Sequence, residues 1–204
     1  LKSRKWNNEQ LNYAWKKLHN KRTGMYEIPI LRPFEKRKLK KELENLSYVF
    51  RTDSDTEVLL ASFAEWGEEC VSKLNGMWAF AIWDSTLDKL FLSRDRMGEK
   101  PFYYHWDGKI FGFCSRPKPW FKVLPHLSSE YDDQALRYYL ESGYVPAPYS
   151  IHKAVRKLPA AHYLEVSKND LKIESYWDPS KIETKISWVK RNQNDLLDEL
   201  DEIL

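Results

Sequence analysis

Cysteine, glycine and long apolar runs are all scarce in this 204-residue sequence. The only cysteines, Cys70 and Cys114, suggest neither a disulfide framework nor a zinc-ligand cluster, and we expect no metal site. The longest apolar run, residues 77–83, is far shorter than the ~20 residues of a membrane-spanning helix. No apolar stretch of signal-peptide length follows the first basic residues. These absences predict a soluble protein of the reducing cytoplasm with no membrane partner.

Positive charge is concentrated near the start of the chain. Residues 1–41 hold 13 Lys and Arg side chains against Glu9, Glu27 and Glu35, a local charge of +10. The remainder holds 20 basic and 27 acidic residues, so the whole chain carries +3. A basic arm of this kind could bind nucleic acid. We favour the alternative of an atypical, solvated N-terminal segment on an acidic domain, which leaves nucleic acid as the weakest candidate partner.

The periodicity of the apolar residues predicts alternating helical and extended regions. Helical spacing predicts helices over residues 11–18, 39–46, 58–66, 131–141 and 186–204. Extended patterns predict strands over residues 48–50, 78–83, 89–94, 102–105, 110–114, 162–166 and 171–175. Ser54 and Glu57 have the spacing of a capping box at a helix start. Asp107-Gly108 and Asn169-Asp170 predict hairpin turns. Antiparallel strands between helices indicate a layered α+β fold.

Three sequence segments occur in a characteristic order. They are residues 51–58 (RTDSDTEV), 74–84 (LNGMWAFAIWD) and 93–104 (SRDRMGEKPFYY). Together they closely resemble the class II glutamine amidotransferase domain of asparagine synthetases, and the resemblance extends over roughly residues 39–204. Residues 144–148, 157–159 and 175–178 are also similar to that family's passage from the glutaminase domain to the synthetase domain. A single short motif would be weak evidence, whereas three in order are strong.

The resemblance implies a particular architecture. It predicts an α+β fold of the N-terminal-nucleophile hydrolase type, a four-layer αββα sandwich that is incomplete here. Residues 1–38 would be an atypical basic segment and residues 39–165 the glutaminase-type domain. Residues 166–204 would be a linker and first helix leading to an ATP-dependent synthetase domain that this chain lacks.

The resemblance also implies a chemistry. In that family an N-terminal cysteine attacks the side-chain amide of glutamine, and its own α-amine moves the proton. Backbone and Asn groups stabilise the oxyanion, an Arg holds the α-carboxylate, and an Asp at a helix start holds the α-ammonium. Ammonia then reaches aspartate that ATP has activated in the synthetase domain. We therefore expect ATP and Mg²⁺ as cofactors of the missing domain and none in this chain.

Only one of these roles transfers to a residue of this sequence. Asp55 matches the position that holds the α-ammonium of glutamine. A simpler interpretation is that Asp55 only favours the positive end of a helix dipole, which contributes ~0.3–1 kcal/mol. Because Asp55 lies within the family segment, we favour the ligand-binding role.

The other glutaminase groups are not found. The chain as given begins with Leu1, and it has no Arg-Gly-Pro-Asp, His-Arg-Arg-Leu or Asn-Gly-Glu-Ile-Tyr-Asn segment. The nearest remnant, residues 23–28 (TGMYEI), lacks the oxyanion Asn. Cys70 and Cys114 have no free α-amine and are expected to be small core residues. The Arg94-Asp95-Arg96 cluster could bind an anion, but we expect it to organise a turn. We predict no catalytic residue and no glutaminase activity from this chain alone.

Three functions remain open. The first is part of an asparagine synthetase-like enzyme, with glutamine and a downstream synthetase domain as partners and a homodimer as a further candidate assembly. The second is a non-hydrolytic scaffold domain, as in β-lactam synthetases and peptide-cyclising relatives that retain this architecture. The third and weakest is a nucleic-acid binder acting through the basic arm.

Overall fold

The computed structural model describes residues 30–123, 127, 129–168 and 170–181. The helices predicted over residues 11–18 and 186–204, and Asn169 of the second predicted turn, lie outside the described residues. The helices are α2 (Pro33–Asn45), α3 (Asp55–Trp66), α4 (Cys70–Lys73), α5 (Trp120–Val123) and α6 (Asp133–Ser142), with 3-10 turns η1 (Gly67–Glu69) and η2 (Pro179–Lys181). None of them, among the residues described, has the length and apolar character needed to cross a membrane.

The largest sheet has four antiparallel strands in the order β3-β4-β8-β9. These strands are β3 (Ala79–Asp84), β4 (Lys89–Arg94), β8 (His162–Ser167) and β9 (Asp170–Ser175). The register places Leu92 of β4 opposite Ala81 on one side and Leu164 on the other. The predicted strands over residues 78–83, 89–94, 162–166 and 171–175 are therefore confirmed.

The remaining described strands form two smaller sheets. The first is three-stranded with the order β6-β5-β7, from β5 (Tyr103–Trp106), β6 (Phe111–Cys114) and β7 (Arg156–Lys157). The predicted hairpin at Asp107-Gly108 joins β5 to β6, with Gly108 at φ +91°. The second pairs β1 (Ile30–Leu31) with β2 (Gly76–Met77).

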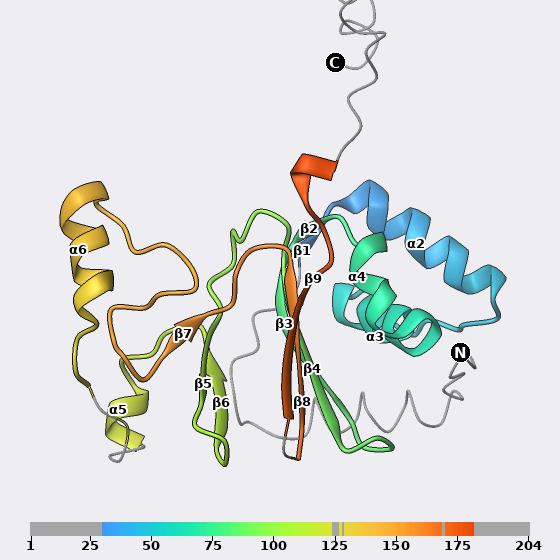
Figure 1. Ribbon diagram of the computed structural model, residues 1–204. Coiled ribbons are helices and arrows are strands. Elements are labelled where there is room, and N and C mark those ends of the chain that lie inside the picture. The colour runs from blue at the N-terminus through green and yellow to red at the C-terminus, as the bar shows by residue number, and fades with distance from the viewer. Residues whose placement is uncertain (1–29, 124–126, 128, 169, 182–204) are drawn as a thin grey trace, which may run out of the picture.

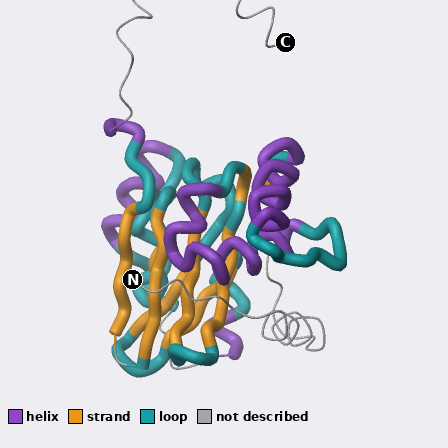
Figure 2. The backbone as a smooth tube through the Cα atoms, turned by 90° about the vertical axis from the view of Figure 1, so that its right-hand side faces the viewer, coloured by secondary structure: helices purple, strands orange, loops and turns teal. Residues whose placement is uncertain are grey.

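The elements form successive layers, as Figure 1 shows. Helices α2, α3 and α4 lie on one side of the four-stranded sheet, the three-stranded sheet lies on its other side, and α5 and α6 lie beyond that. Figure 2 looks from the helical side onto the strands behind. The prediction of a layered α+β fold is confirmed.

Two apolar clusters hold the layers together. The first lies between the helices and the four-stranded sheet and includes Leu43, Val58 and Phe91. The second lies between the two larger sheets and includes Leu92, Phe102 and Leu164. Because successive side chains of a strand point to opposite faces, neighbouring residues Phe91 and Leu92 join different clusters. The four-stranded sheet is thus covered on both faces.

Strand β3 carries the longest apolar run of the sequence. Trp78, just before it, is 0% exposed, and Phe80 and Ile82 are buried against the helices. Trp83 is the exception, with half of its surface exposed. Residues 78–83 therefore lie between layers except at Trp83.

Two local predictions differ from the structure. Residues 48–50 form no strand, and the Tyr48 hydroxyl instead donates a hydrogen bond to Glu65 on α3. The helix predicted from residue 39 begins earlier, because Pro33 is accommodated in the first turn, where a missing N–H costs nothing. The expected division between residues 38 and 39 therefore falls inside α2.

Candidate functional site

The start of α3 is fixed by side chains of the preceding loop. Ser54 is the N-cap residue, and its Oγ accepts a hydrogen bond from the Thr56 N–H at 3.2 Å. The predicted return bond from Glu57 to the cap is not formed. Glu57 accepts from the Arg51 and Thr52 N–H groups at 2.9 and 2.8 Å, and from the Thr52 hydroxyl at 2.6 Å. The capping box is therefore half realised, because the loop before the helix offers Glu57 three donors.

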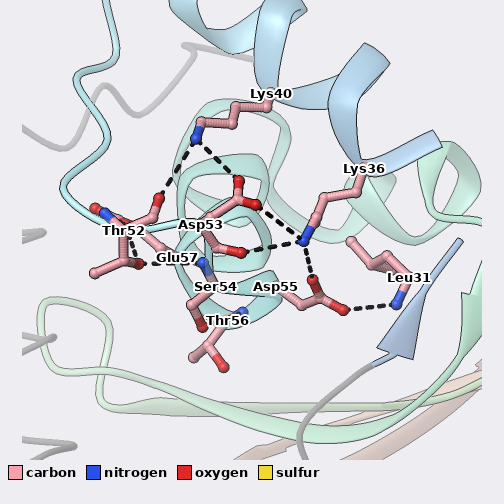
Figure 3. Close-up of polar contacts among 9 residues, drawn as sticks. All are labelled: Leu31, Lys36, Lys40, Thr52, Asp53, Ser54, Asp55, Thr56 and Glu57. Carbon is pink, nitrogen blue, oxygen red and sulfur yellow. Dashed lines mark hydrogen bonds and ion pairs between the residues drawn. The ribbon is translucent and has the colours of Figure 1, made fainter. Parts of the chain in front are cut away.

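Asp55, the first residue of α3, lies where three elements meet (Figure 3). Its Oδ2 accepts a hydrogen bond from the Leu31 N–H of β1 at 2.8 Å. Its Oδ1 lies 3.1 Å from the Nζ of Lys36 on α2. Only 17% of the Asp55 side chain is exposed. The carboxylate thus connects β1, α2 and α3, and it holds a primary ammonium in a partly desolvated position.

A second carboxylate lies at the outer edge of this contact. The Lys36 ammonium donates to the Asp53 carbonyl oxygen at 3.1 Å and lies 3.7 Å from Asp53 Oδ2. Lys40 binds the other carboxylate oxygen of Asp53 at 3.2 Å. The hydrogen bond from Lys40, with the charge of Lys36, lowers the pKa of the exposed Asp53 carboxyl. Asp53 therefore remains an anion well below neutral pH.

The chemistry that this arrangement supports is the recognition of a primary ammonium. A carboxylate that is partly buried and bonded to a backbone N–H keeps its negative charge aimed at one donor. The α-ammonium of an amino acid is the same chemical group as the Lys36 head group. Within the described ranges, no three His, Cys, Asp or Glu side chains come together in a way that could hold a metal ion.

Neither cysteine has the surroundings of a nucleophile. Cys70 is 0% exposed, and its burial raises the pKa of its thiol far above the usual range. Cys114 on β6 is half-buried, and burial raises the pKa of its thiol to about 12. Since the thiolate is the reactive form, both are poor nucleophiles at neutral pH. The expectation that Cys70 is a core residue is confirmed.

The Arg94-Asp95-Arg96 cluster binds the backbone rather than an exposed anion. Arg94 donates to the carbonyl oxygens of Gly98, Lys100 and Leu158. Arg96 donates to the carbonyl oxygens of Ser72 and Leu74. Asp95 is buried and accepts hydrogen bonds from four backbone N–H groups, those of Trp78, Met97, Glu99 and Lys100. The interpretation of this cluster as a turn organiser is confirmed.

Sequence reasoning found Asp55 but missed its partner. Lys36 is one of several basic residues in α2, and no spacing rule singles it out from Lys38 or Lys41. Its pairing with Asp55 spans 19 positions and depends on how α2 crosses the start of α3. The only available signal was the basic character of the helix, which is not specific.

The pattern of the glutamine amidotransferase domain family matches residues 33–177. A putative glutamine-hydrolysing asparagine synthetase 2 of Methanocaldococcus jannaschii is 39% identical over 138 residues, which are 66% of this chain and 27% of that protein. Asparagine synthetase 3 of Bacillus subtilis is 40% identical over 141 residues, 69% of this chain and 23% of that protein. The chain thus spans about a quarter of the length of these relatives.

Among solved structures, glutamine phosphoribosylpyrophosphate amidotransferase from B. subtilis, complexed with ADP and GMP, is similar with a TM-score of 0.48. Its sequence identity is 22%, and the match covers 69% of this chain and 26% of that one.

Proposed function

Because the chain belongs to the glutamine amidotransferase domain family, we propose that it forms the glutamine-recognising part of an asparagine synthetase-like enzyme. In this proposal Asp55 holds the α-ammonium of glutamine. The side-chain amide would be the source of ammonia for the amidation of aspartate. ATP and Mg²⁺ would act in a synthetase domain that corresponds to the unmatched part of the relatives.

The observation that carries the proposal is the contact between Asp55 and an ammonium group. The Lys36 Nζ lies 3.1 Å from Asp55 Oδ1, so the two groups form a close ion pair. The Leu31 N–H bond to Oδ2 fixes the carboxylate so that its other oxygen faces that ammonium. A free amino acid could present the same group to the same oxygen once Lys36 has moved.

The test is a titration of the 204-residue chain with glutamine, in which binding is measured by calorimetry or ligand-observed NMR. Glutaramate, which has the same amide but no α-ammonium, is the matched control ligand. We expect glutamine to bind and glutaramate not to bind. We also expect Asp55→Asn to weaken glutamine binding at least tenfold, which corresponds to a loss of about 1.4 kcal/mol or more of binding free energy. The unfolding curve of Asp55→Asn must show that the variant is folded. Equal binding of the two ligands, or an unaffected Asp55→Asn variant, would contradict the proposal.

One observation favours a second candidate, a scaffold domain that does not hydrolyse glutamine. The only thiols are Cys70 and Cys114, whose pKa values are raised by burial. We therefore propose that this 204-residue chain alone releases no ammonia from glutamine. Ammonia release above that of heat-denatured protein, and lost in Cys114→Ala, would overturn this part of the proposal.

A further inference from the structure

The Asp55 carboxylate is already satisfied by groups of the chain itself. Lys36 places its ammonium against Oδ1, and the Leu31 N–H occupies Oδ2 (Figure 3). The exposed fractions of the Lys36 and Asp55 side chains are 18% and 17%, so the ion pair is largely shielded from water. A ligand ammonium and the Lys36 ammonium would therefore compete for the same oxygen.

We propose that Lys36 is an intramolecular competitor of the ligand at Asp55, and that it regulates access to the ammonium subsite. This inference rests on the proposed function, because it assumes that Asp55 receives the α-ammonium of an amino acid. In the state described here α2 holds the subsite closed. Binding requires the Lys36 side chain to leave Asp55 while α2 remains in place.

Asp53 makes this displacement reversible. The Lys36 ammonium already contacts the Asp53 carbonyl oxygen at 3.1 Å and lies 3.7 Å from its carboxylate. The Asp53 side chain is 78% exposed, so it can receive the displaced ammonium without further desolvation. Lys36 can therefore exchange one carboxylate for a neighbouring one rather than lose its partner to water. A displaced Lys36 would also remain beside the ligand and be able to return.

The apparent affinity for the ligand should then fall with the fraction of chains in which Asp55 is open. A protein whose competent state is rare binds with an affinity reduced by that fraction. If Lys36 covers Asp55 in about nine chains out of ten, its removal should tighten glutamine binding about tenfold. Removal of a positive charge elsewhere on α2 should not have this effect, because that charge does not contact Asp55.

The experiment compares the parent 204-residue chain with two variants in glutamine titrations. Lys36→Met removes the competing ammonium and keeps a long, unbranched side chain that suits a helix. Lys41→Met removes the same charge from an exposed position of the same helix. We expect Lys36→Met to bind glutamine about tenfold more tightly than the parent chain and Lys41→Met to bind within twofold of it. Lys36→Gln serves in place of Lys36→Met if the thermal unfolding of the latter shows a loss of structure.

A second measurement follows the Lys36 ammonium directly. In the parent chain with ¹⁵N-labelled lysine, saturation with glutamine should shift the Nζ resonance of Lys36 and leave that of Lys41 in place. Adding Asp55→Asn to Lys36→Met should remove the gain in affinity.

The outcomes separate the inference from the function on which it rests. If parent and Lys36→Met bind glutamine equally, and Asp55→Asn abolishes binding in both, the proposed function stands and the competition is refuted. If Lys36→Met binds more weakly than the parent, Lys36 assists the ligand and the inference is again refuted. If none of the folded variants binds glutamine, the function and the inference both fail.

Discussion

Trp78 and Asp95 are hydrogen-bonded to each other in both directions. The Asp95 N–H donates to the Trp78 carbonyl oxygen at 3.0 Å, and the Trp78 N–H donates to the Asp95 carboxylate at 3.3 Å. The Trp78 indole N–H also donates to the Ser93 hydroxyl, so two of the family segments are joined at a buried point. This junction lies at the end of β4, where the following residues turn around the Asp95 carboxylate and donate three backbone N–H groups to it.

The Asp95 carboxylate should be among the most costly side chains to remove. Its truncation in Asp95→Ala removes a buried carboxylate and leaves four backbone N–H groups without their acceptor. We expect the free energy of unfolding to fall by about 3–5 kcal/mol, as for other broken buried charge networks. Urea unfolding curves would measure this, with Glu99→Ala as the control because Glu99 is exposed in the same turn. Similar losses in the two variants would contradict the role given to Asp95.

Two aromatic residues of β3 should respond very differently to truncation. Phe80 is 5% exposed and contacts the helices, whereas Trp83 is 50% exposed. We expect Phe80→Ala to cost about 3–5 kcal/mol of unfolding free energy, through lost burial and a cavity. Trp83→Ala should cost about 1 kcal/mol, because much of its surface already contacts water. Chemical denaturation of both variants tests the layer assignment, which would be wrong if the order were reversed.

Gly98 should not tolerate a side chain. Its φ is +65°, and a Cβ there would lie 3.0 Å from Ala160 Cβ and 3.1 Å from Arg94 Cζ. Gly143, with φ +75° at the end of α6, has no atom within 4 Å of such a Cβ. We expect Gly143→Ala to cost about 1–2 kcal/mol from backbone strain alone. Gly98→Ala should cost about 1–3 kcal/mol more, from overpacking against Arg94. Thermal melts of the two variants would give the difference, and equal values would refute the steric argument.

Alkaline pH should destabilise the chain through Cys70. Burial raises the pKa of this thiol above its ordinary value of 9.0. Below pH 9 this group does not make the free energy of unfolding depend on pH, because the thiol is neutral in both the folded and the unfolded chain. Above pH 9 only the unfolded chain ionises, so the free energy of unfolding falls by about 1.4 kcal/mol per pH unit for this group.

Denaturation of the parent chain and Cys70→Ala at several pH values between 8 and 11 would isolate this effect. The cavity in Cys70→Ala lowers stability at every pH. Above pH 9, however, the free energy of unfolding of this variant should fall less steeply with pH, because one fewer proton is released on unfolding. Tyrosines such as Tyr48 and Tyr163, whose raised pKa values do not depend on Cys70, contribute equally to both proteins. Parallel slopes would show that Cys70 does ionise in the folded chain.

Much of the framework could be predicted from short stretches of sequence. The period of two in a β-strand places Phe91 and Leu92 of β4 on opposite faces, and that inference requires no knowledge of the rest of the chain. Ser54 was identified as a helix cap, and Asp107-Gly108 as a hairpin turn, from their immediate neighbours. Such signals work because the preferences behind them, for burial and for backbone dihedral angles, act within a few residues.

The candidate site likewise has one feature that the sequence predicts and others that depend on the fold. The sequence by itself determined that Asp55 stands at a helix start within a family segment. Only the tertiary structure decided that Lys36 and Leu31 bind its two oxygens, that Glu57 turns toward Thr52, and that Arg94 binds Leu158. The Lys36, Leu31 and Leu158 contacts join segments that are distant in sequence and meet through the docking of α2, β1 and the residue after β7. Several lysines of α2 would satisfy any sequence pattern equally well. A carboxylate selects the donor that packing brings within about 3 Å, and that distance is fixed by the fold rather than by local sequence.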